Sequence, residues 1–559
     1  MKKRVSGVAS GCALAAAILL AAAIPASAQQ HRGRPFVYPV LRGETSPPLR
    51  QIPPVQPKIG REIVPLRAVP RQTSAPQADP VVQSSAEALV QTNTPVGFEG
   101  LGAGFSGFNM QAAPPDTNGA VGPDHYVQWV NLSYVVFDKQ GNKVYGPTAG
   151  NTLWKNSSLT ACATTNDGDP SVQYDSLADR WVMMQLSYSS GSGYYECLAI
   201  STTSNFLGSW YLYALQWSST LPDYPKLGIW PDAYYVTQNL FYLQSIFVGG
   251  QVCALDRSKM LQGLDATAQC ITLSSYPSLL PSTVDGPAPP AGSPDYVMNM
   301  GSNSLNLFKY HVDFANPNNS TLTGPISVQG VAAFSSACGG GTCIPQPGTN
   351  QQLDSLGDRL MYRLAYRKFG DHESLVVTHS VDPNGGSTGG GHGHGHGPAN
   401  IEWSKKPGNG KNGGGGGGSS SAVSAIRWYE IRSPNTTPTV YQQGTYSPDT
   451  DSRWMGSIAM DKAGDIAVGY SVSSGTTYPS IRYTGRVPSD TLGTLEGEAT
   501  VVDGSGSQLT NLNRWGDYSS MSVDPTDGCT FWYTTEYMES NGTFNWHTRI
   551  ATFKFPTCN

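Results

Sequence analysis

The chain has 559 residues, of which 13% are charged and 63 are glycine, and its formal net charge is −5. A low charged fraction with many glycine and aromatic residues is typical of turn-rich, extracellular all-β proteins. The negative balance excludes a general nucleic-acid binder, which needs a basic face to displace counterions from phosphates.

The first residues have the features of a secretory signal peptide. Residues 2–4 are positively charged, residues 13–24 form an apolar core, and residues 25–28 form an A-x-A cleavage site. We therefore expect residues 1–28 to be a Sec-type signal peptide and the protein to be secreted or periplasmic. No other stretch is apolar and long enough to predict a membrane span.

The next segment, residues 29–95, is rich in proline, glutamine and arginine and has no sustained hydrophobic periodicity. This composition predicts a disordered, polyproline-like arm that acts as a solvated spacer.

Eight cysteines follow the signal peptide. An even number in a chain that enters an oxidising compartment predicts disulfides, and the lack of any C-x-x-C spacing disfavours a zinc site. Eight cysteines allow 105 connectivities. We expect nearest neighbours in the sequence to pair, which gives Cys162–Cys197, Cys253–Cys270, Cys338–Cys343 and Cys529–Cys558.

From Phe98 onward, pairs of short β-rich runs joined by turn residues recur along the chain. The interval between copies is about 53 to 69 residues, with one of about 95; the copies begin near Asp116, Asp169, Tyr224, Ser293, Asp358, Arg453 and Arg514. The long interval contains residues 383–421, a Gly/Ser/His-rich insertion that we expect to be flexible. Its alternating histidines are interpreted as part of a linker and not as a metal site.

Two or more strand signals every 50 to 65 residues or so are typical of a β-propeller blade, which is a four-stranded sheet. We predict an all-β protein in which residues 96–559 form a single β-propeller, with seven blades favoured and six to eight open. Ring closure commonly brings both chain ends into one blade, where a Cys529–Cys558 bond would hold the last strand. Two β-sandwich domains are the alternative.

Several long strings resemble a family of secreted, largely uncharacterised bacterial proteins that looks propeller-like. They are PPDTNGAVGPDHYVQWVN (114–131), YDSLADRW (174–181), YPKLGIWPDAYY (224–235), DSLGDRLMYRLAYR (354–367), RWMGSIAMDKAGDIAVGYS (453–471) and RWGDYSSMSVDP (514–525). The resemblance implies a propeller over residues 98–556 and transfers no catalytic residue. The likeness to sialidase-type propellers is only distant, because the S-x-D-x-G-x-T-W Asp-box and the Arg-Ile-Pro motif are missing.

In a propeller, the loops that enter the innermost strands line the mouth of the central channel. At such a mouth, guanidinium groups can form paired hydrogen bonds with ligand carboxylates, side-chain carboxylates can accept hydrogen bonds from sugar hydroxyls, and indole rings can stack on pyranose rings. The predicted ligand-binding residues are Asp116, Asn118, Lys226, Asp358, Arg359, Arg453, Trp454, Arg514 and Trp515.

The favoured function is binding of an extracellular ligand, a glycan above all, by a monomer without a cofactor. One alternative is a glycoside hydrolase, which needs two carboxylates beside the scissile bond, here Asp169 and Asp517. Another alternative is a surface scaffold for protein–protein interaction. A structural calcium held by residues 116–119 and 166–169 is left open, since neither segment completes an EF-hand. Turn capping and packing between blades explain the same repeated residues without any ligand.

Overall fold

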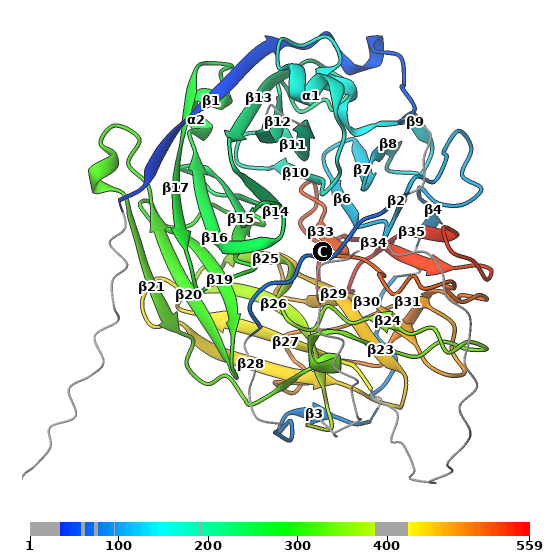
Figure 1. Cartoon of the computed structure of the whole chain (residues 1–559). Coiled ribbons are helices and arrows are strands. Elements are labelled where there is room, and N and C mark those ends of the chain that lie inside the picture. The colour runs from blue at the N-terminus through cyan, green and yellow to red at the C-terminus, as the bar shows by residue number, and fades with distance from the viewer. Residues whose placement is uncertain are drawn as a thin grey trace, which may run out of the picture.

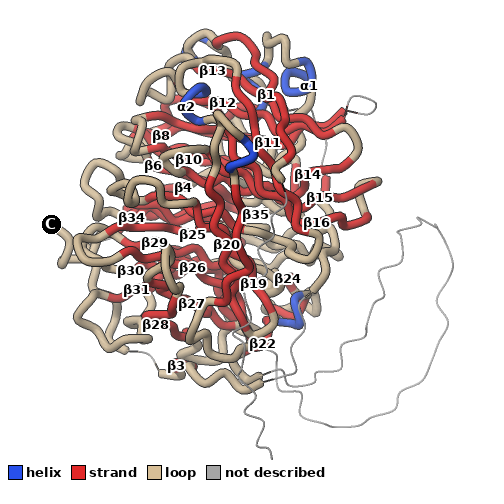
Figure 2. The backbone as a smooth tube through the Cα atoms, turned by 90° about the vertical axis from the view of Figure 1, so that its left-hand side faces the viewer, coloured by secondary structure: helices blue, strands red, loops and turns tan. Residues whose placement is uncertain are grey.

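The structure is a computed structural model that describes residues 34–57, 62–71, 77–85, 87–93, 96–189, 193–385 and 423–559. The predicted signal peptide and the insertion from residue 386 lie outside these ranges. Strands dominate the described chain (Figure 2), where the helices are short: α1 (Thr160–Thr164), α2 (Arg257–Met260), η1 (Leu49–Gln51), η2 (Gly150–Trp154), η3 (Pro317–Asn319) and η4 (Ala337–Gly340). No helix among the described residues is both long and apolar enough to cross a membrane.

The described strands pair into seven four-stranded antiparallel units, which follow one another along the chain (Figure 1). Unit 1 consists of β6 (Thr117–Val121), β7 (His125–Val130), β8 (Ser133–Asp138) and β9 (Lys143–Ala149). Unit 2 consists of β10 (Ser171–Asp175), β11 (Arg180–Ser189), β12 (Gly193–Ser201) and β13 (Trp210–Trp217). Unit 3 consists of β14 (Thr220–Ile229), β15 (Tyr234–Tyr242), β16 (Ile246–Leu255) and β17 (Ala266–Leu273).

The remaining units continue the same pattern. Unit 4 consists of β18 (Leu280–Val284), β19 (Asp295–Gly301), β20 (Ser304–His311) and β21 (Thr321–Ser327). Unit 5 consists of β25 (Met361–Lys368), β26 (Glu373–Asp382), β27 (Ala425–Arg432) and β28 (Thr439–Tyr446). Unit 6 consists of β29 (Ser452–Met460), β30 (Ile466–Ser473), β31 (Ser480–Arg486) and β32 (Ala499–Val502). Unit 7 consists of β33 (Ser520–Val523), β34 (Phe531–Met538), β35 (Trp546–Phe553) and β4 (Val96–Glu99). Short strands outside the units are β2 (Glu62–Ile63), β3 (Val82–Gln83), β5 (Ala112–Ala113), β22 (Ser335–Ser336), β23 (Thr342–Ile344) and β24 (Leu353–Asp354).

The first strand of each unit lies innermost, and these strands form a closed ring. Each contacts the next in the order β6, β10, β14, β18, β25, β29 and β33, and β33 contacts β6 again. This closed arrangement of radial sheets is a β-propeller, so the predicted all-β propeller fold is confirmed. Both faces of each unit pack against the sheets of the neighbouring units. This is why the innermost strands β6 and β29 are buried along their whole length.

Unit 7 closes the ring with both ends of the chain. Its first three strands are C-terminal, and β4 from the N-terminal part adds to β35 through pairs that include Ile550↔Phe98. The Cys529–Cys558 disulfide ties the segment after β35 to the turn before β34. The other three disulfides are Cys162–Cys197, Cys253–Cys270 and Cys338–Cys343, so the predicted nearest-neighbour pairing is confirmed.

The described part of the N-terminal arm differs from the predicted disorder. Strand β1 (Phe36–Thr45) lies between β13 and β17, antiparallel to both, and joins the outer edges of units 2 and 3. Strand β3 pairs with β28, and Leu89 bridges to Gly497 in unit 6. Composition could not show this order, because the arm is held by the open backbone edges of outer strands and only slightly by burial of its own side chains.

Residues 62–71, here called the strap, run across the middle of the ring (Figure 1). Within the strap, β2 pairs in parallel with β5, just before unit 1. The Arg67 guanidinium binds the Asp223 carboxylate of unit 3 at 2.6 Å, and Arg71 donates to the carbonyl of Gly340 at 2.8 Å. The strap therefore covers the end of the central channel at which the innermost strands begin.

Candidate functional site

The central channel has two ends, called the entry end and the exit end. The innermost strands begin at the entry end, under the strap, and finish at the exit end. Sequence reasoning placed the site at the entry end.

Three predicted acidic residues meet at the entry end. Asp116, Asp169 and Asp517 are buried, and each offers a carboxylate oxygen that lies within 4.8 Å of the others. Asp116 directly precedes β6, and Asp169 stands two residues before the start of β10. Both have φ of 46°, a left-handed conformation that aspartate tolerates better than most residues. The repeated turn before each inner strand therefore brings these carboxylates together.

Hydrogen bonds from neighbouring groups occupy the carboxylates of Asp116 and Asp169. Asp116 Oδ1 accepts a hydrogen bond from the Asp517 amide at 2.8 Å, and its Oδ2 accepts one from Asn131 Nδ2 at 2.9 Å. Asp169 Oδ2 accepts one from the Tyr224 amide at 3.1 Å. These bonds link unit 1 to unit 7 and unit 2 to unit 3, so the aspartates hold adjacent units in register.

Three predicted cations complete the cluster at the entry end. Arg514 Nη1 lies 2.7 Å from Asp517 Oδ1, and Arg359 Nε lies 2.7 Å from Asp358 Oδ1. Lys226 Nζ sits 3.4 Å from the ring centroid of Tyr224. The positive and negative side chains of this cluster largely compensate one another.

The surroundings of the three aspartates shift their pKa values in different directions. Burial and the neighbouring Asp517 carboxylate raise the pKa of Asp116 well above its ordinary value. Burial and the same neighbour raise the pKa of Asp169, against the opposing effect of Lys226. Burial alone would raise the pKa of Asp517, but the Arg514 guanidinium holds it below its ordinary value. Burial lowers the pKa of Lys226 to about 8, against the attraction of the aspartates.

The strap leaves little space above this cluster. Arg514 Nε donates to the Val64 carbonyl of the strap at 3.3 Å. The cavity between the strap, Asp169 and Asp223 has a volume of about 60 Å³. Pockets for small ligands usually have about 300 to 1,000 Å³, so this cavity has room for water but not for a sugar ring.

Four further predicted ligand-binding residues lie in the packing between strands and units. Arg453 is buried and paired with Asp449 at 2.8 Å and Glu498 at 2.9 Å. The indoles of Trp454 and Trp515 pack against each other at 5.7 Å in an apolar cluster. Asn118 Oδ1 accepts a hydrogen bond from the Val172 amide at 2.8 Å. These indole faces are buried and so are not available for stacking on a sugar.

The exit end holds an open pocket of about 290 Å³. Units 1, 2, 4, 5 and 7 contribute to its wall, and its polar lining includes Gln173, Asp285, Arg363, Arg367, Ser522 and Asp524. None of the ligand-binding residues predicted from the sequence lines this pocket. Its signal was the run MYRLAYRK in β25, where two arginines at an even spacing lie on one face of an otherwise apolar strand.

Most charged side chains at the exit-end pocket form ion pairs within the described chain, but the Arg367 guanidinium does not. Arg363 Nη2 pairs with Asp285 Oδ1, and Lys139 Nζ pairs with Asp524 at 2.8 Å. Arg367 is 4% exposed, and its one polar contact among the described residues runs from Nε to the Met460 carbonyl at 2.8 Å. Burial lowers the pKa of Arg367, while the more distant Asp285 opposes this, and an arginine remains cationic.

Two polar atoms of residues in the same pocket wall also lack partners. Asp285 Oδ2 and Ser522 Oγ are buried, and within the described chain neither has a hydrogen-bond partner. Buried polar atoms are normally satisfied, so unpartnered atoms in a pocket wall indicate a place for water or for polar groups of a ligand.

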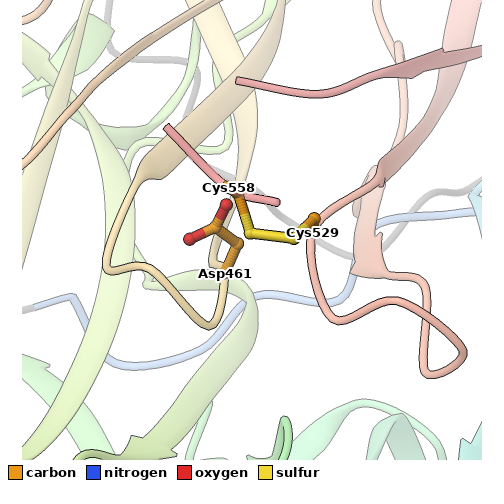
Figure 3. A group of neighbouring side chains, drawn as sticks. All are labelled: Asp461, Cys529 and Cys558. Atoms are coloured by element: carbon orange, nitrogen blue, oxygen red, sulfur yellow. A yellow bond between two sulfur atoms is a disulfide. The ribbon is translucent and has the colours of Figure 1, made fainter. Parts of the chain in front are cut away.

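Among the described residues, two groups of side chains have the spacing of metal ligands. The first is Asp461, Cys529 and Cys558 (Figure 3), but its sulfurs form a disulfide and are not thiolates. The second is the aspartate group at the entry end, which includes one residue from each predicted calcium segment. Lys226 and Arg514 already supply positive charge there, so this group does not resemble an open cation site.

No protein-family profile and no curated protein matches the chain, so the resemblance to uncharacterised secreted bacterial proteins stays a prediction. Among solved structures, the chain is similar to an exo-β-1,3-galactanase of Clostridium thermocellum at 13% identity, with 78% of this chain and 82% of that chain covered and a TM-score of 0.29. It is also similar to an exo-β-1,3-galactanase of Phanerochaete chrysosporium at 11% identity, with 84% and 97% covered and a TM-score of 0.27. The WD40 domain of SCAP from fission yeast follows at 10% identity, with 76% and 80% covered and a TM-score of 0.29. Such low similarity carries no argument about activity.

Proposed function

We propose that this protein is a secreted, monomeric β-propeller that binds an acidic glycan in the pocket at the exit end of its central channel. The observation that carries this proposal is the buried Arg367 guanidinium, which lines the pocket and has no carboxylate partner in the described part of the chain. A carboxylate on a sugar would complete its hydrogen bonding and its charge.

The rest of the pocket suits the hydroxyl groups of a sugar. Asp285 Oδ2 can accept a hydrogen bond, and Ser522 Oγ can donate or accept one. The volume of about 290 Å³ is near the lower end of the range for small-ligand sites. The wall is built from innermost strands and from the residues that directly follow them, such as Asp285 after β18, so these groups are held close to the rigid sheet.

The proposal keeps the predicted ligand class but moves the site from the entry end to the exit end. The four disulfides support a protein that works outside the cytosol, since such bonds persist in oxidising compartments.

Titration calorimetry with galacturonic acid and its neutral counterpart galactose tests the proposal. We expect the intact protein to bind the acid and Arg367→Gln to weaken that binding at least tenfold. Arg42→Gln is the matched control, because Arg42 is an exposed arginine on β1 paired only with Asp265 at 3.1 Å. Equal binding of both sugars, no binding of the acid, or no effect of Arg367→Gln would contradict the proposal.

A glycoside hydrolase at the entry end is the second candidate. The observation that favours it is the divergence of the aspartate pKa values, since raised and lowered carboxyl groups side by side are what acid and base roles need. Substrate could reach Asp169 and Asp517 only if the strap moved away.

The hydrolase candidate is tested with a variant whose residues 62–71 are replaced by a Gly-Ser linker. Release of nitrophenol from nitrophenyl glycosides by this variant, and its loss on Asp517→Asn, is the expected result for an enzyme. If neither the intact chain nor the variant releases nitrophenol, the candidate fails.

A further inference from the structure

We propose that the glycan site continues from the exit-end pocket into a second pocket between units 5 and 6, so that the ligand is a chain with more than one acidic sugar. This inference rests on the proposed function and adds the length and charge pattern of the ligand.

The second pocket has a volume of about 140 Å³. It is lined by the ends of β25, β29 and β31 and by side chains of β27 and β28, including Phe369, His372, Glu430, Arg432, Tyr441 and Arg486. A single small polar group or part of a sugar ring fits such a volume, which makes the pocket a subsite and not an independent site for a large ligand.

Arg486 resembles Arg367 in having a buried guanidinium with a single polar contact among the described residues. It is 2% exposed, and the one polar contact of its guanidinium among the described residues runs from Nη2 to the Asp490 carbonyl at 2.7 Å. Its buried Nε has no hydrogen-bond partner. The neighbouring Arg432 differs, because its Nε donates to Glu430 Oε1 at 2.7 Å. One guanidinium of the second pocket is therefore satisfied, while the other is short of an acceptor.

Aromatic rings line the same pocket as the Arg486 guanidinium. Phe369 and His372 stack with their ring centroids 4.7 Å apart, and Tyr441 is 43% exposed beneath the Arg432 guanidinium. Flat rings at the rim and a buried guanidinium in the wall suit a sugar ring that carries a carboxylate.

The two pockets are neighbours across the end of β25. Arg367 lines the first pocket and Phe369 lines the second, and two residues of strand span only about 7 Å. The Met460 carbonyl that accepts from Arg367 belongs to a residue of the second pocket's wall. This adjacency is the basis on which we place successive carboxylates of one extended chain on Arg367 and Arg486.

Titration calorimetry with galacturonic acid and with its linear oligomers of two to four units tests this extension. We expect oligomers to bind at least tenfold more tightly than the monomer. Arg486→Gln should remove this gain and leave monomer binding unchanged, whereas Arg367→Gln should weaken both. Tyr441→Ala, at the exposed rim, should reduce the gain without any folding defect, and Arg42→Gln should change nothing.

The outcomes separate the two proposals. If monomer and oligomers bind equally and Arg367→Gln still abolishes binding, the extension is wrong while the proposed function stands. If Arg486→Gln and Tyr441→Ala leave the gain from length unchanged, the second pocket is not the subsite. If none of the acids binds, the proposed function itself fails.

Discussion

Arginines with the same predicted role occupy different environments in this protein. Arg453 and Arg514 each begin a repeat copy, yet Arg453 is enclosed by Asp449 and Glu498, while Arg514 pairs with Asp517 at the entry end. Arg367, which lies inside a strand, faces an open pocket instead. The number of carboxylates around each guanidinium, and not its place in the repeat, decides whether it can bind a ligand.

Replacing Arg453 by methionine tests its structural role. The buried guanidinium balances two carboxylates, so Arg453→Met should lower the free energy of unfolding by about 3 kcal/mol. Denaturant titration followed by tryptophan fluorescence measures this loss. Binding of galacturonic acid should not change, and loss of binding at unchanged stability would return Arg453 to the ligand site.

We expect the stability of the protein to depend on pH through the buried carboxyl group of Glu536. Burial raises the pKa of Glu536 to about 8, although the hydroxyls of Thr117 and Thr535 donate to its carboxylate and oppose the rise. The folded state therefore holds this proton more tightly than the unfolded chain, and the stability from Glu536 is lost as pH rises from about 4.5 through about 8.

Glu536→Gln should remove that loss. The amide imitates the protonated carboxyl, so thermal unfolding of the variant should match the parent near pH 4.5 and exceed it at pH 9, by a free energy on the order of a few kcal/mol. Identical profiles for Glu536→Gln and the parent would show that Glu536 titrates normally.

At the scale of elements, several strands near the rim of the propeller have backbone edges that pair with strands from the N-terminal part of the chain. Strand β1 covers the edges of β13 and β17, β3 covers β28, and β4 covers β35. An uncovered edge presents free backbone groups that invite pairing with another molecule. The N-terminal arm therefore serves the ring as a set of edge strands.

The Cys529–Cys558 disulfide should contribute strongly to the stability of unit 7. It joins residues 29 positions apart, and the loop-entropy relation gives about 3 to 4 kcal/mol for such a loop. The double serine variant should unfold at correspondingly lower denaturant concentration. The Cys338–Cys343 pair spans 5 positions, so its double serine variant should lose less, about 2 kcal/mol. Equal losses would argue against the entropic explanation.

At the scale of the whole molecule, the arm and the strand β4 that follows it together close the ring and cover one end of its channel. Strand β4 completes unit 7, while the strap contacts residues at the entry of units 1, 3 and 7. The cavity left over the entry-end aspartates has about 60 Å³, whereas the pocket at the exit end has about 290 Å³, so these long-range contacts decide at which end of the channel a ligand can bind.

Removal of the arm should therefore have a different effect from removal of the strap alone. A variant that begins at residue 101 lacks β1 and β4, and we expect the exposed edge of β35 to cause association, measured by size-exclusion chromatography with light scattering. The variant with a Gly-Ser linker in place of the strap keeps β1 and β4 and should stay monomeric. A monomeric, cooperatively unfolding arm-free variant would show that the ring closes without β4.

The features that could be predicted from the sequence are local ones. Turn residues between short β-rich runs recur at blade-like intervals, and each disulfide joins cysteines that are neighbours in the chain, so both were predicted correctly. The meeting of Asp116, Asp169 and Asp517 also followed from the repeat, since equivalent turns lie at the same end of the ring.

Exposure of those residues depends on contacts between distant parts of the chain. Arg514 meets the strap carbonyl of Val64 across 450 residues, and Arg67 reaches Asp223 across 156. A repeat pattern shows which side chains occupy equivalent places, but it contains no information on what lies over them. Tertiary packing therefore decided that the entry end is closed, that the arm is ordered and that the Arg367 guanidinium faces a pocket. Each of these outcomes depends on which distant segment of the chain contacts the groups concerned.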